Sequence, residues 1–369
     1  MLNMSLPFRA DHVGSLLRTA RLKENRTRWK QGQLDNSTLR QIENEEIKTT
    51  IDRLEATGMK AITDGEFRRD YFHLDFLQQL GGVTVTGGID ANPAAKVASD
   101  GFTPPKLSVT GKLKHIKNIQ VDDFLYLQSI TNQTPKVSIP SPTMVHFRGG
   151  RAAISIVAYP DMDVFFTDLA NAYKDEIKAL YDAGCRYIQL DDTNLAYLCD
   201  PKMRAAAKDR GEDPNALPHT YADLINSVIA DRPDDLTIGI HLCRGNYRST
   251  WFAEGGYEPV AEVLFNEIKV DAYFLEYDDE RSGDFAPLRF VPSTKKVVAG
   301  VMSSKVAELE TEAFLSDRIK EASKYMPLEN LCISPQCGFS STHHGNQLTE
   351  DDQWRKFERL VKVAEMIWK

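Results

Sequence analysis

Residues 236–246 read LTIGIHLCRGN, an apolar run that reaches His241 and Cys243 and then enters a glycine-containing turn. A continuous apolar run of this length is typical of a strand buried on both faces of a parallel sheet. Further short apolar runs recur along the chain and end near Ser15, Asp64, Ser141, Asp191, His241, Glu276, Gly300 and Ser334. Amphipathic stretches lie between several of them, at 37–57, 162–183, 257–269 and 305–325. These eight strand ends predict an α/β fold, a single (β/α)8 or TIM-barrel domain over residues 1–369.

The segment of about residues 81–135 interrupts this rhythm. Residues 81–88 and 106–112 alternate with a period of two and contain glycine at the points where the chain could turn. The pattern predicts a β-hairpin insertion after the second strand. Loops at that point lie on the face of a barrel where active sites form, so the insertion is expected to cover the pocket or to be a surface loop.

Composition and charge exclude several kinds of partner. The chain has 53 acidic and 45 basic residues, a net charge of -8, and no basic cluster interleaved with aromatic residues, so we expect no nucleic acid partner. The N-terminus lacks a signal-peptide pattern, and no run approaches the roughly 18 apolar residues of a membrane span. We therefore expect a cytoplasmic protein that contacts no membrane, and its oligomeric state is not indicated. The five cysteines should then be reduced.

Soft metal ligands follow three of the predicted strands. His241 and Cys243 are two residues apart on an extended chain and therefore project to the same side. Glu276 ends the next strand, 35 residues after His241, and Cys337 follows the last strand, 61 residues after Glu276. An imidazole, two thiols and a carboxylate at one rim are suited to Zn2+, and their origin in three strand ends favours a catalytic site over a structural one.

Other predicted strand ends carry polar side chains with no evident structural purpose. Ser15 follows the first strand, Glu66 the second, and Asp191 ends the fourth. A carboxylate at such a position can simply cap a helix or face solvent. Two acids beside a zinc site also fit recognition of an ammonium group.

At these residues the chain resembles the catalytic C-terminal half of cobalamin-independent methionine synthase. The matching segments are 13–15, 63–69, 189–192, 241–246, Glu276 and 336–338. The resemblance implies a zinc site of His241, Cys243, Glu276 and Cys337 that binds the thiol of homocysteine, which a methyl donor then converts to methionine. It also implies that Ser15, Glu66 and Asp191 hold the amino acid part of homocysteine.

Three departures from that family concern the methyl donor. The chain has no room for the second, N-terminal barrel of full-length members and resembles the short "core" type. Residues 143–147 end in Phe147 where the family has a tryptophan, and residues 300–305 lack the histidine proposed to protonate the leaving folate. His12 and His343 are the candidates for a replacement acid, with His344 beside the latter, although His12 could simply pack against its strand.

Two rival functions remain open at this point. An epoxyalkane:coenzyme M transferase would use the same zinc site for a thiol that carries a sulfonate, and Arg68, Arg69 or Arg244 would have to bind that anion. A non-catalytic zinc-binding barrel is the second alternative. The presence of Ser15, Glu66 and Asp191 favours an amino acid thiol over both.

Overall fold

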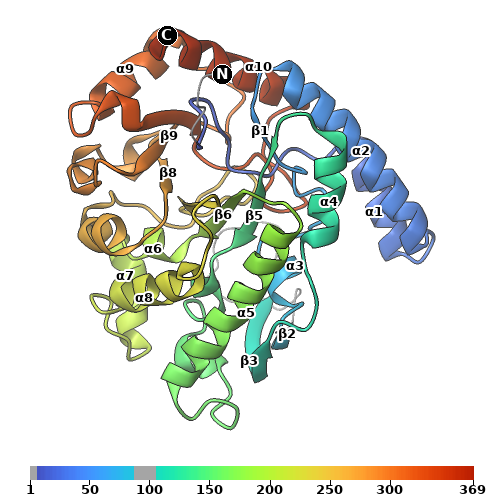
Figure 1. The fold of residues 1–369 in the computed structure, drawn as a ribbon, viewed down its shortest axis with the longest axis vertical. Coiled ribbons are helices and arrows are strands. Elements are labelled where there is room, and N and C mark those ends of the chain that lie inside the picture. Colours follow the sequence, from blue (N-terminus) through green and yellow to red (C-terminus); the bar gives the residue numbers. More distant parts are fainter. Residues whose placement is uncertain (1–5, 87–104) are drawn as a thin grey trace.

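The computed structural model describes residues 6–86 and 105–369. Its centre is a sheet of six parallel strands in the order β10-β9-β8-β7-β6-β5 (Figure 1). These strands are β5 (Val137–Pro140), β6 (Tyr187–Asp192), β7 (Thr237–Leu242), β8 (Ala272–Glu276), β9 (Lys296–Met302) and β10 (Leu331–Pro335). Nearly all of their residues are buried, as the continuous apolar runs predict for strands covered on both faces. The predicted α/β class and its parallel sheet are confirmed.

Two further short strands adjoin this sheet. β1 (Ala61–Ile62) pairs in parallel with β4 (Thr134–Pro135), which runs on into β5 after one residue. Residues 9–16 lie beside β10, because the Asp11 amide donates to the Ile333 carbonyl over 3.0 Å. The Leu16 amide donates to the Gly65 carbonyl, also over 3.0 Å, so this segment also contacts the chain just after β1.

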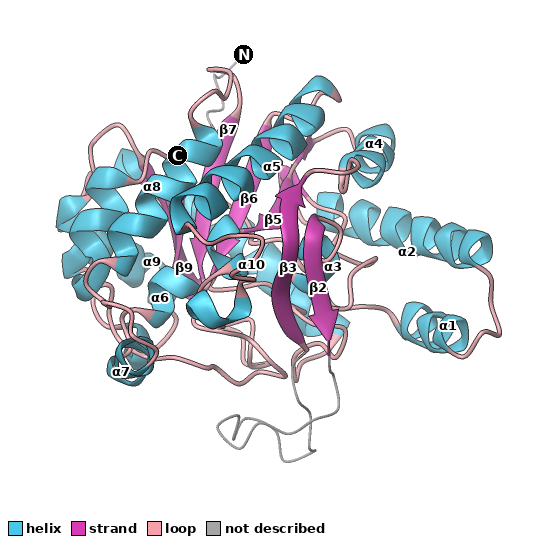
Figure 2. Ribbon diagram, turned by 90° about the horizontal axis from the view of Figure 1, so that it is seen from below, coloured by secondary structure: helices cyan, strands magenta, loops and turns pink. Residues whose placement is uncertain are grey.

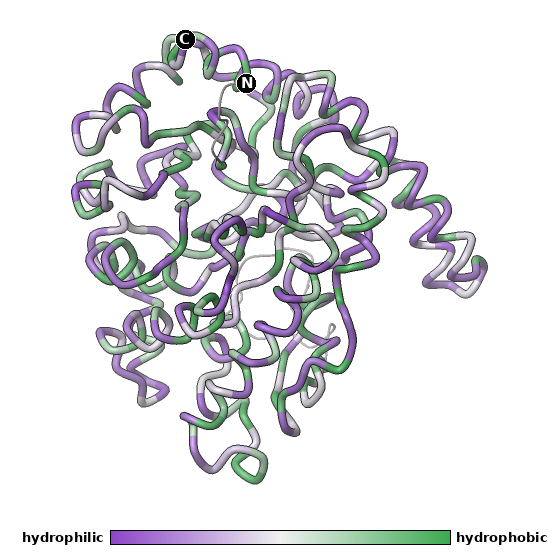
Figure 3. Tube along the Cα trace, viewed as in Figure 1, coloured by the Kyte–Doolittle hydropathy of each residue, from purple (hydrophilic) through white to green (hydrophobic). Residues whose placement is uncertain are grey.

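Helices lie around the sheet (Figure 2). They are α1 (Ala20–Lys30), α2 (Asn36–Ala56), α3 (Leu74–Leu77), α4 (Val121–Ile130), α5 (Met162–Asp182), α6 (Asn194–Tyr197), α7 (Pro201–Asp209), α8 (Leu217–Ile229), α9 (Glu312–Ala322) and α10 (Glu350–Ile367). Figure 2 shows α8 and α9 on one side of the sheet and α4 and α2 on the other. The longest helices begin at side-chain caps: Asp35 accepts from the Thr38 amide, and Thr349 and Asp352 form a capping box. Figure 3 shows hydrophobic and hydrophilic segments alternating along α1 and α2, as expected for helices with one packed face.

Single turns of 3-10 or π type connect the remaining elements. They are η1 (Pro142–Val145), η2 (Gly150–Ala153), η3 (Glu258–Val260), η4 (Val263–Glu267), η5 (Glu280–Ser282), η6 (Ala286–Phe290) and η7 (Leu328–Asn330). The amphipathic stretch predicted at 257–269 is helical over residues 258–267, although mostly of 3-10 and π type (η3 and η4) rather than a regular α-helix. The stretch 305–325 contains a shorter helix than predicted, α9.

An antiparallel ladder follows β1 within the predicted insertion. β2 (Gly81–Thr86) pairs with β3 (Lys106–Lys114), and the residues that join them lie outside the described part of the chain. β3 contacts α5 and the turns η1 and η2 that follow β5. The predicted boundary at 135 is too late, because α4 and β4 belong to the next helix and strand. Among the described residues, no helix is long and apolar enough to cross a membrane.

Candidate metal and thiol-binding site

The predicted metal ligands lie where neighbouring parallel strands end. His241 is the fifth residue of β7, and Cys243 follows that strand directly. Glu276 is the last residue of β8, and Cys337 lies two residues beyond β10. Because the sheet is parallel, these carboxyl ends share one edge, and all four side chains are almost fully buried there.

Three of the four residues form a compact cluster. The ligand atoms of His241, Cys243 and Cys337 lie within 4.8 Å of one another. Cys243 Sγ is 3.3 Å from Cys337 Sγ, and His241 Nδ1 is 3.3 Å from the Phe274 carbonyl oxygen. His241 Nε2 is buried and has no hydrogen-bond partner. One nitrogen anchored to a carbonyl and the other unpaired beside two thiols is the arrangement expected of a zinc-binding histidine.

The two thiols differ in acidity. The hydrogen bond from Cys243 holds the pKa of Cys337 well below its usual range, and nearby His241 adds to this effect against the cost of burial. The same hydrogen bond, together with burial, raises the pKa of Cys243 well above its usual range. Burial lowers the pKa of His241, but the Cys337 thiolate outweighs it and the net shift is upward. Without a metal, the two opposite shifts favour a proton on Cys243 and a negative charge on Cys337.

Glu276 lies at the edge of this cluster and is held by basic groups. Its Oε1 is 3.7 Å from Cys243 Sγ and 3.8 Å from Lys305 Nζ. Its Oε2 accepts from the Arg244 amide over 3.1 Å and from Arg244 Nη1 over 3.4 Å, and it is 3.8 Å from Arg281 Nη2. The carboxylate is therefore close enough to become a further ligand after a side-chain movement. In its present position the neighbouring basic side chains balance its negative charge.

Glu66 and Asp191 are buried acids with incomplete hydrogen bonding. Glu66 Oε1 accepts from Ser138 Oγ over 3.0 Å, whereas Oε2 is buried without a partner. Asp191 Oδ1 accepts from Gln189 Nε2 over 2.7 Å. Asp191 pairs in register with His241 on the neighbouring strand, which places this acid next to the sulfur cluster.

Both acids have pKa values above the ordinary range. Burial raises the pKa of Asp191 to about 7; His241 acts against the rise, and Glu66 adds to it. The pKa of Glu66 is likewise raised by burial, with Arg69 and Arg18 acting in the opposite direction. A buried pair of acids that cannot comfortably carry two negative charges is suited to a cationic ligand such as an ammonium group.

Ser15 lies in the segment 9–16, which runs beside β10. Its Oγ accepts from the Ser340 amide over 3.3 Å, and its carbonyl accepts from the Phe339 amide over 2.9 Å. A Cβ atom on Gly338 would lie 1.9 Å from Ser15 Oγ, so only glycine allows this close approach. Ser15 is therefore packed directly against the residue that follows Cys337.

The two candidate acid histidines have different environments. His12 is 1% exposed, its Nε2 is 3.0 Å from the Ala61 carbonyl oxygen, and its ring packs edge-on against Phe357 of α10. This is the environment of a packed histidine. His343 lies half-buried in the loop after β10, its Nδ1 is unpaired, and its pKa is lowered chiefly by burial. Ser341 in the same loop has its Oγ 3.7 Å from Cys337 Sγ.

The three arginines considered as sulfonate ligands already have partners. Arg68 Nη2 donates to Asn44, and its guanidinium lies near the carboxylates of Glu43, Asp64 and Asp123. Arg69 donates to Gln120 Oε1 over 2.8 Å and to the Ser138 carbonyl over 2.7 Å. Arg244 is fully buried against Glu276 and the Tyr257 hydroxyl. Two nitrogens of Arg68 and Nη1 of Arg69 are buried without a hydrogen-bond partner, so the carboxylates beside these arginines, and not a lack of donors, disfavour a sulfonate.

Sequence reasoning missed two buried cations at the site. Lys305 follows β9, and its Nζ is buried without a hydrogen-bond partner beside Glu276. Arg18 follows Ser15 by three residues and is 2% exposed. A basic residue just beyond an apolar strand end was the available signal, but basic residues in such loops are usually exposed.

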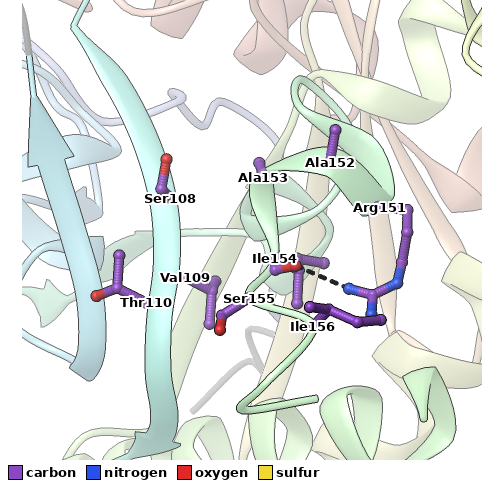
Figure 4. Close-up of a pocket in the computed structure, with 9 residues that line it drawn as sticks. All are labelled: Ser108, Val109, Thr110, Arg151, Ala152, Ala153, Ile154, Ser155 and Ile156. Carbon is purple, nitrogen blue, oxygen red and sulfur yellow. Dashed lines mark hydrogen bonds between the residues drawn. The ribbon is translucent and has the colours of Figure 1, made fainter. Parts of the chain in front are cut away.

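An open groove of about 550 Å3 lies elsewhere, between β3 and the segment around η2 (Figure 4). It contains none of the predicted site residues. Its Arg151 donates to the Ile154 carbonyl over 2.8 Å and to the Tyr159 carbonyl over 2.7 Å. The groove is therefore unrelated to the sulfur cluster.

The fold and the cluster together define an α/β protein with a buried His/Cys/Cys cluster, of a kind that could hold a metal ion, at the carboxyl ends of its parallel strands. The model of one family, described as the catalytic domain of cobalamin-independent synthase, matches residues 8–364. The chain belongs to this family.

Three similar proteins match this chain over most of their length. The chain is 46% identical to uncharacterized protein YxjH of Bacillus subtilis (strain 168), over 98% of this chain and 95% of that protein. It is 25% identical to the methionine synthase of Saccharolobus solfataricus, over 88% of this chain and 86% of the relative. A solved structure, the putative vitamin-B12 independent methionine synthase from Listeria monocytogenes, superimposes with a TM-score of 0.78 at 38% identity and full coverage of both chains. These likenesses support the expected family resemblance.

Proposed function

We propose that this protein is a zinc-dependent methyltransferase that converts homocysteine to methionine. The observation that carries the proposal is the convergence of unpaired buried polar atoms on one place. His241 Nε2 lies beside two thiols, and Glu66 Oε2 lies in the neighbouring acid pair. Buried polar groups without partners are rare in folded proteins and indicate an absent ligand. A ligand with a sulfur at one end and an ammonium at the other accounts for both.

The donor set fits zinc. His241, Cys243 and Cys337 would hold the ion, and Glu276 would be a further ligand. When Glu276 does not bind the metal, Arg244 and Lys305 hold its carboxylate in its present position. Zinc at this place supplies the positive charge that favours the thiolate form of a substrate thiol at neutral pH.

The chain's own residues orient the amino acid and handle its proton. Glu66 and Asp191 bind the ammonium group, and Ser15 contacts the amino acid part from the first strand. The sulfur then attacks the methyl carbon of the donor, so that one sulfur–carbon bond forms while the carbon–donor bond breaks. His343 Nδ1 holds a proton for the departing donor, because it is unpaired and lies in the same loop as Ser341, which contacts Cys337.

The proposal includes the closure of the parallel sheet into a barrel. We propose that residues 9–16, the first strand along the chain, complete a sheet of eight strands and close a (β/α)8 barrel between β10 and β1. The backbone hydrogen bonds of Asp11 and Leu16 to either side support this closure. The β2–β3 ladder is then an insertion on the face that carries the site.

The decisive experiment is an assay of purified, zinc-loaded protein for methionine formed from homocysteine. Methyltetrahydrofolate monoglutamate, methyltetrahydrofolate triglutamate and simple methyl donors are tested in parallel. Methionine that forms only with zinc present supports the proposal. Alkylation of coenzyme M by an epoxide, without methionine formation from any donor, would identify the sulfonate-thiol alternative instead.

A further inference from the structure

Arg18 is a buried cation whose partners are main-chain carbonyl oxygens. Its Nη1 donates to the carbonyls of Leu16, over 3.4 Å, and of Ser340. Its Nη2 donates to the carbonyls of Glu66, over 2.6 Å, and of Arg69, over 3.0 Å. Among the described residues, no carboxylate forms an ion pair with it. The planar fork of a guanidinium is well suited to hold several fixed acceptors at once.

These four carbonyls belong to three separate loops, and each loop carries a residue of the proposed site. Leu16 follows Ser15, Glu66 is itself a predicted ligand of the ammonium group, and Ser340 lies three residues after Cys337. The loops also touch one another directly, because the Ser340 amide donates to Ser15 Oγ over 3.3 Å. Arg18 therefore joins the acid that would bind the ammonium group to the loop that carries a sulfur ligand.

The hydrogen bond from Arg18 to Glu66 acts on a residue whose backbone conformation is constrained. Glu66 has a φ of 58°, in the left-handed region that side chains other than glycine rarely adopt. Both polar groups of the Glu66 backbone are also hydrogen-bonded. Its amide donates to Asp64 Oδ1 over 2.9 Å, and its carbonyl accepts from Arg18 Nη2. The position of the Glu66 carboxylate thus depends on Arg18 and Asp64 together.

We propose that Arg18 is a positioning residue that sets the span between the ammonium pocket and the sulfur site, and so favours homocysteine over cysteine. The inference rests on the proposed function. The two thiols differ by one methylene, so a site that holds both ends of its substrate distinguishes them by length. A displacement of about 1 Å in such a site can cost roughly 100-fold in rate, and one methylene is worth about 10- to 200-fold in discrimination.

The test compares the binding of homocysteine and cysteine to zinc-loaded protein by calorimetry. Arg18→Lys and Arg18→Met each lose the fork that serves three loops. We expect the homocysteine dissociation constant to rise about tenfold or more, and the preference over cysteine to shrink by a similar factor. Zinc content should stay at the wild-type value. Arg151→Met is the matched control, because Arg151 also donates to two carbonyls but lies at the groove beside β3 (Figure 4).

The remaining outcomes separate this inference from the proposed function. The inference about Arg18 is overturned if the Arg18 variants bind homocysteine and cysteine equally more weakly, or if they only have a lower melting temperature. Loss of zinc from these variants overturns it as well. If neither variant folds, Gly338→Ala tests the same span, because its Cβ would meet Ser15 Oγ at 1.9 Å; an unchanged preference then overturns the inference. Wild type that binds neither thiol overturns the proposed function as well, whereas an unchanged preference in folded Arg18 variants overturns this inference alone.

Discussion

Cys243 Sγ lies 3.3 Å from Cys337 Sγ, although 94 residues separate the two cysteines in the chain. Two neutral thiols gain little from such proximity, but one thiol and one thiolate gain a charge-assisted hydrogen bond. The opposite pKa shifts of Cys337 and Cys243 follow from that sharing of one proton. A divalent cation would remove the remaining proton, since metal-bound thiols are deprotonated. Metal affinity should therefore depend strongly on both residues.

The first prediction concerns these two cysteines. Cys243→Ser and Cys337→Ser should each lose most bound zinc, because serine replaces a soft anionic ligand with a neutral hydroxyl. Metal analysis of purified protein measures the effect. Cys185→Ser is the control, since Cys185 is equally buried and its Sγ donates to the Tyr187 carbonyl oxygen over 3.5 Å. Either site variant that keeps one zinc per chain and full activity contradicts the ligand assignment.

The second prediction concerns the ammonium pocket. Asp191→Asn should weaken homocysteine binding by about 2–5 kcal/mol, or roughly 30-fold to several thousand-fold, because a buried charge loses its partner. Zinc content should not change. Asp182→Asn is a control on the surface, where Asp182 pairs with Lys178. Unchanged affinity for homocysteine in Asp191→Asn would favour a thiol without an ammonium group.

The third prediction links pH to the stability of the metal-free protein. The pKa of Asp191 is raised from 3.8 to about 7, chiefly by burial, so the folded chain keeps a proton that the unfolded chain releases near pH 4. Between these values the folded state binds more protons, and the contribution of this residue to the free energy of unfolding falls as pH rises. Asp191→Asn should therefore gain stability relative to wild type between about pH 4 and pH 7. Urea denaturation at a series of pH values measures the difference, and parallel curves for the two proteins would refute it.

The fourth prediction separates the two histidines. With a donor whose leaving group must be protonated, His343→Gln should lower kcat by about 10²–10⁴-fold with little change in homocysteine affinity, the typical loss when general acid catalysis is removed. His12→Gln should instead lower the melting temperature, because the His12 ring packs against Phe357 inside the fold. Steady-state kinetics and thermal denaturation of both variants provide the comparison. The reverse pattern would transfer the acid role to His12.

The sequence predicted that His241, Cys243 and Cys337 lie close together because the ends of buried strands can be recognised from their apolar runs. β7, β8 and β10 are largely apolar runs, and His241, Glu276 and Cys337 each lie within two residues of the end of one of these strands. Their convergence follows from parallel pairing alone. The same reasoning failed at α4, a helix of ten residues with only three buried side chains, which was absorbed into the insertion. Short elements carry too few periods for their pattern to be decisive.

Charged residues in the interior could not be predicted. The sequence shows Arg18 after Leu16 and Leu17, and Lys305 after two serines, but burial of either cation depends on partners from distant parts of the chain. Arg18 uses carbonyls of three loops, and Lys305 faces Glu276 from another strand end. Such groups become visible only when the loops are assembled, since isolated basic residues are mostly exposed.

The last prediction is that the methyl donor is not a folate polyglutamate. Phe147 stands where a stacking tryptophan is expected, and the structure leaves it 4% exposed, with its ring against Tyr197 and Tyr221 and beneath the guanidinium of Arg210. A ring enclosed in this way offers no free face to a pterin. The segment after β9 supplies Ser303, Ser304 and Lys305 rather than a histidine, and an amine leaving group departs poorly unless an acid protonates it.

A donor with a better leaving group, or a protein-bound methyl carrier, tolerates both changes. Methyltetrahydrofolate triglutamate should therefore support methyl transfer far below the rate of about 1 s⁻¹ at the lower end of typical enzymes. Stopped assays of methionine formation by zinc-loaded protein, with triglutamate and alternative donors at equal concentration, measure this directly. Steady turnover with triglutamate at about 1 s⁻¹ or faster would contradict the prediction, and loss of that turnover in His343→Gln would then identify His343 as the acid that replaces the family's histidine.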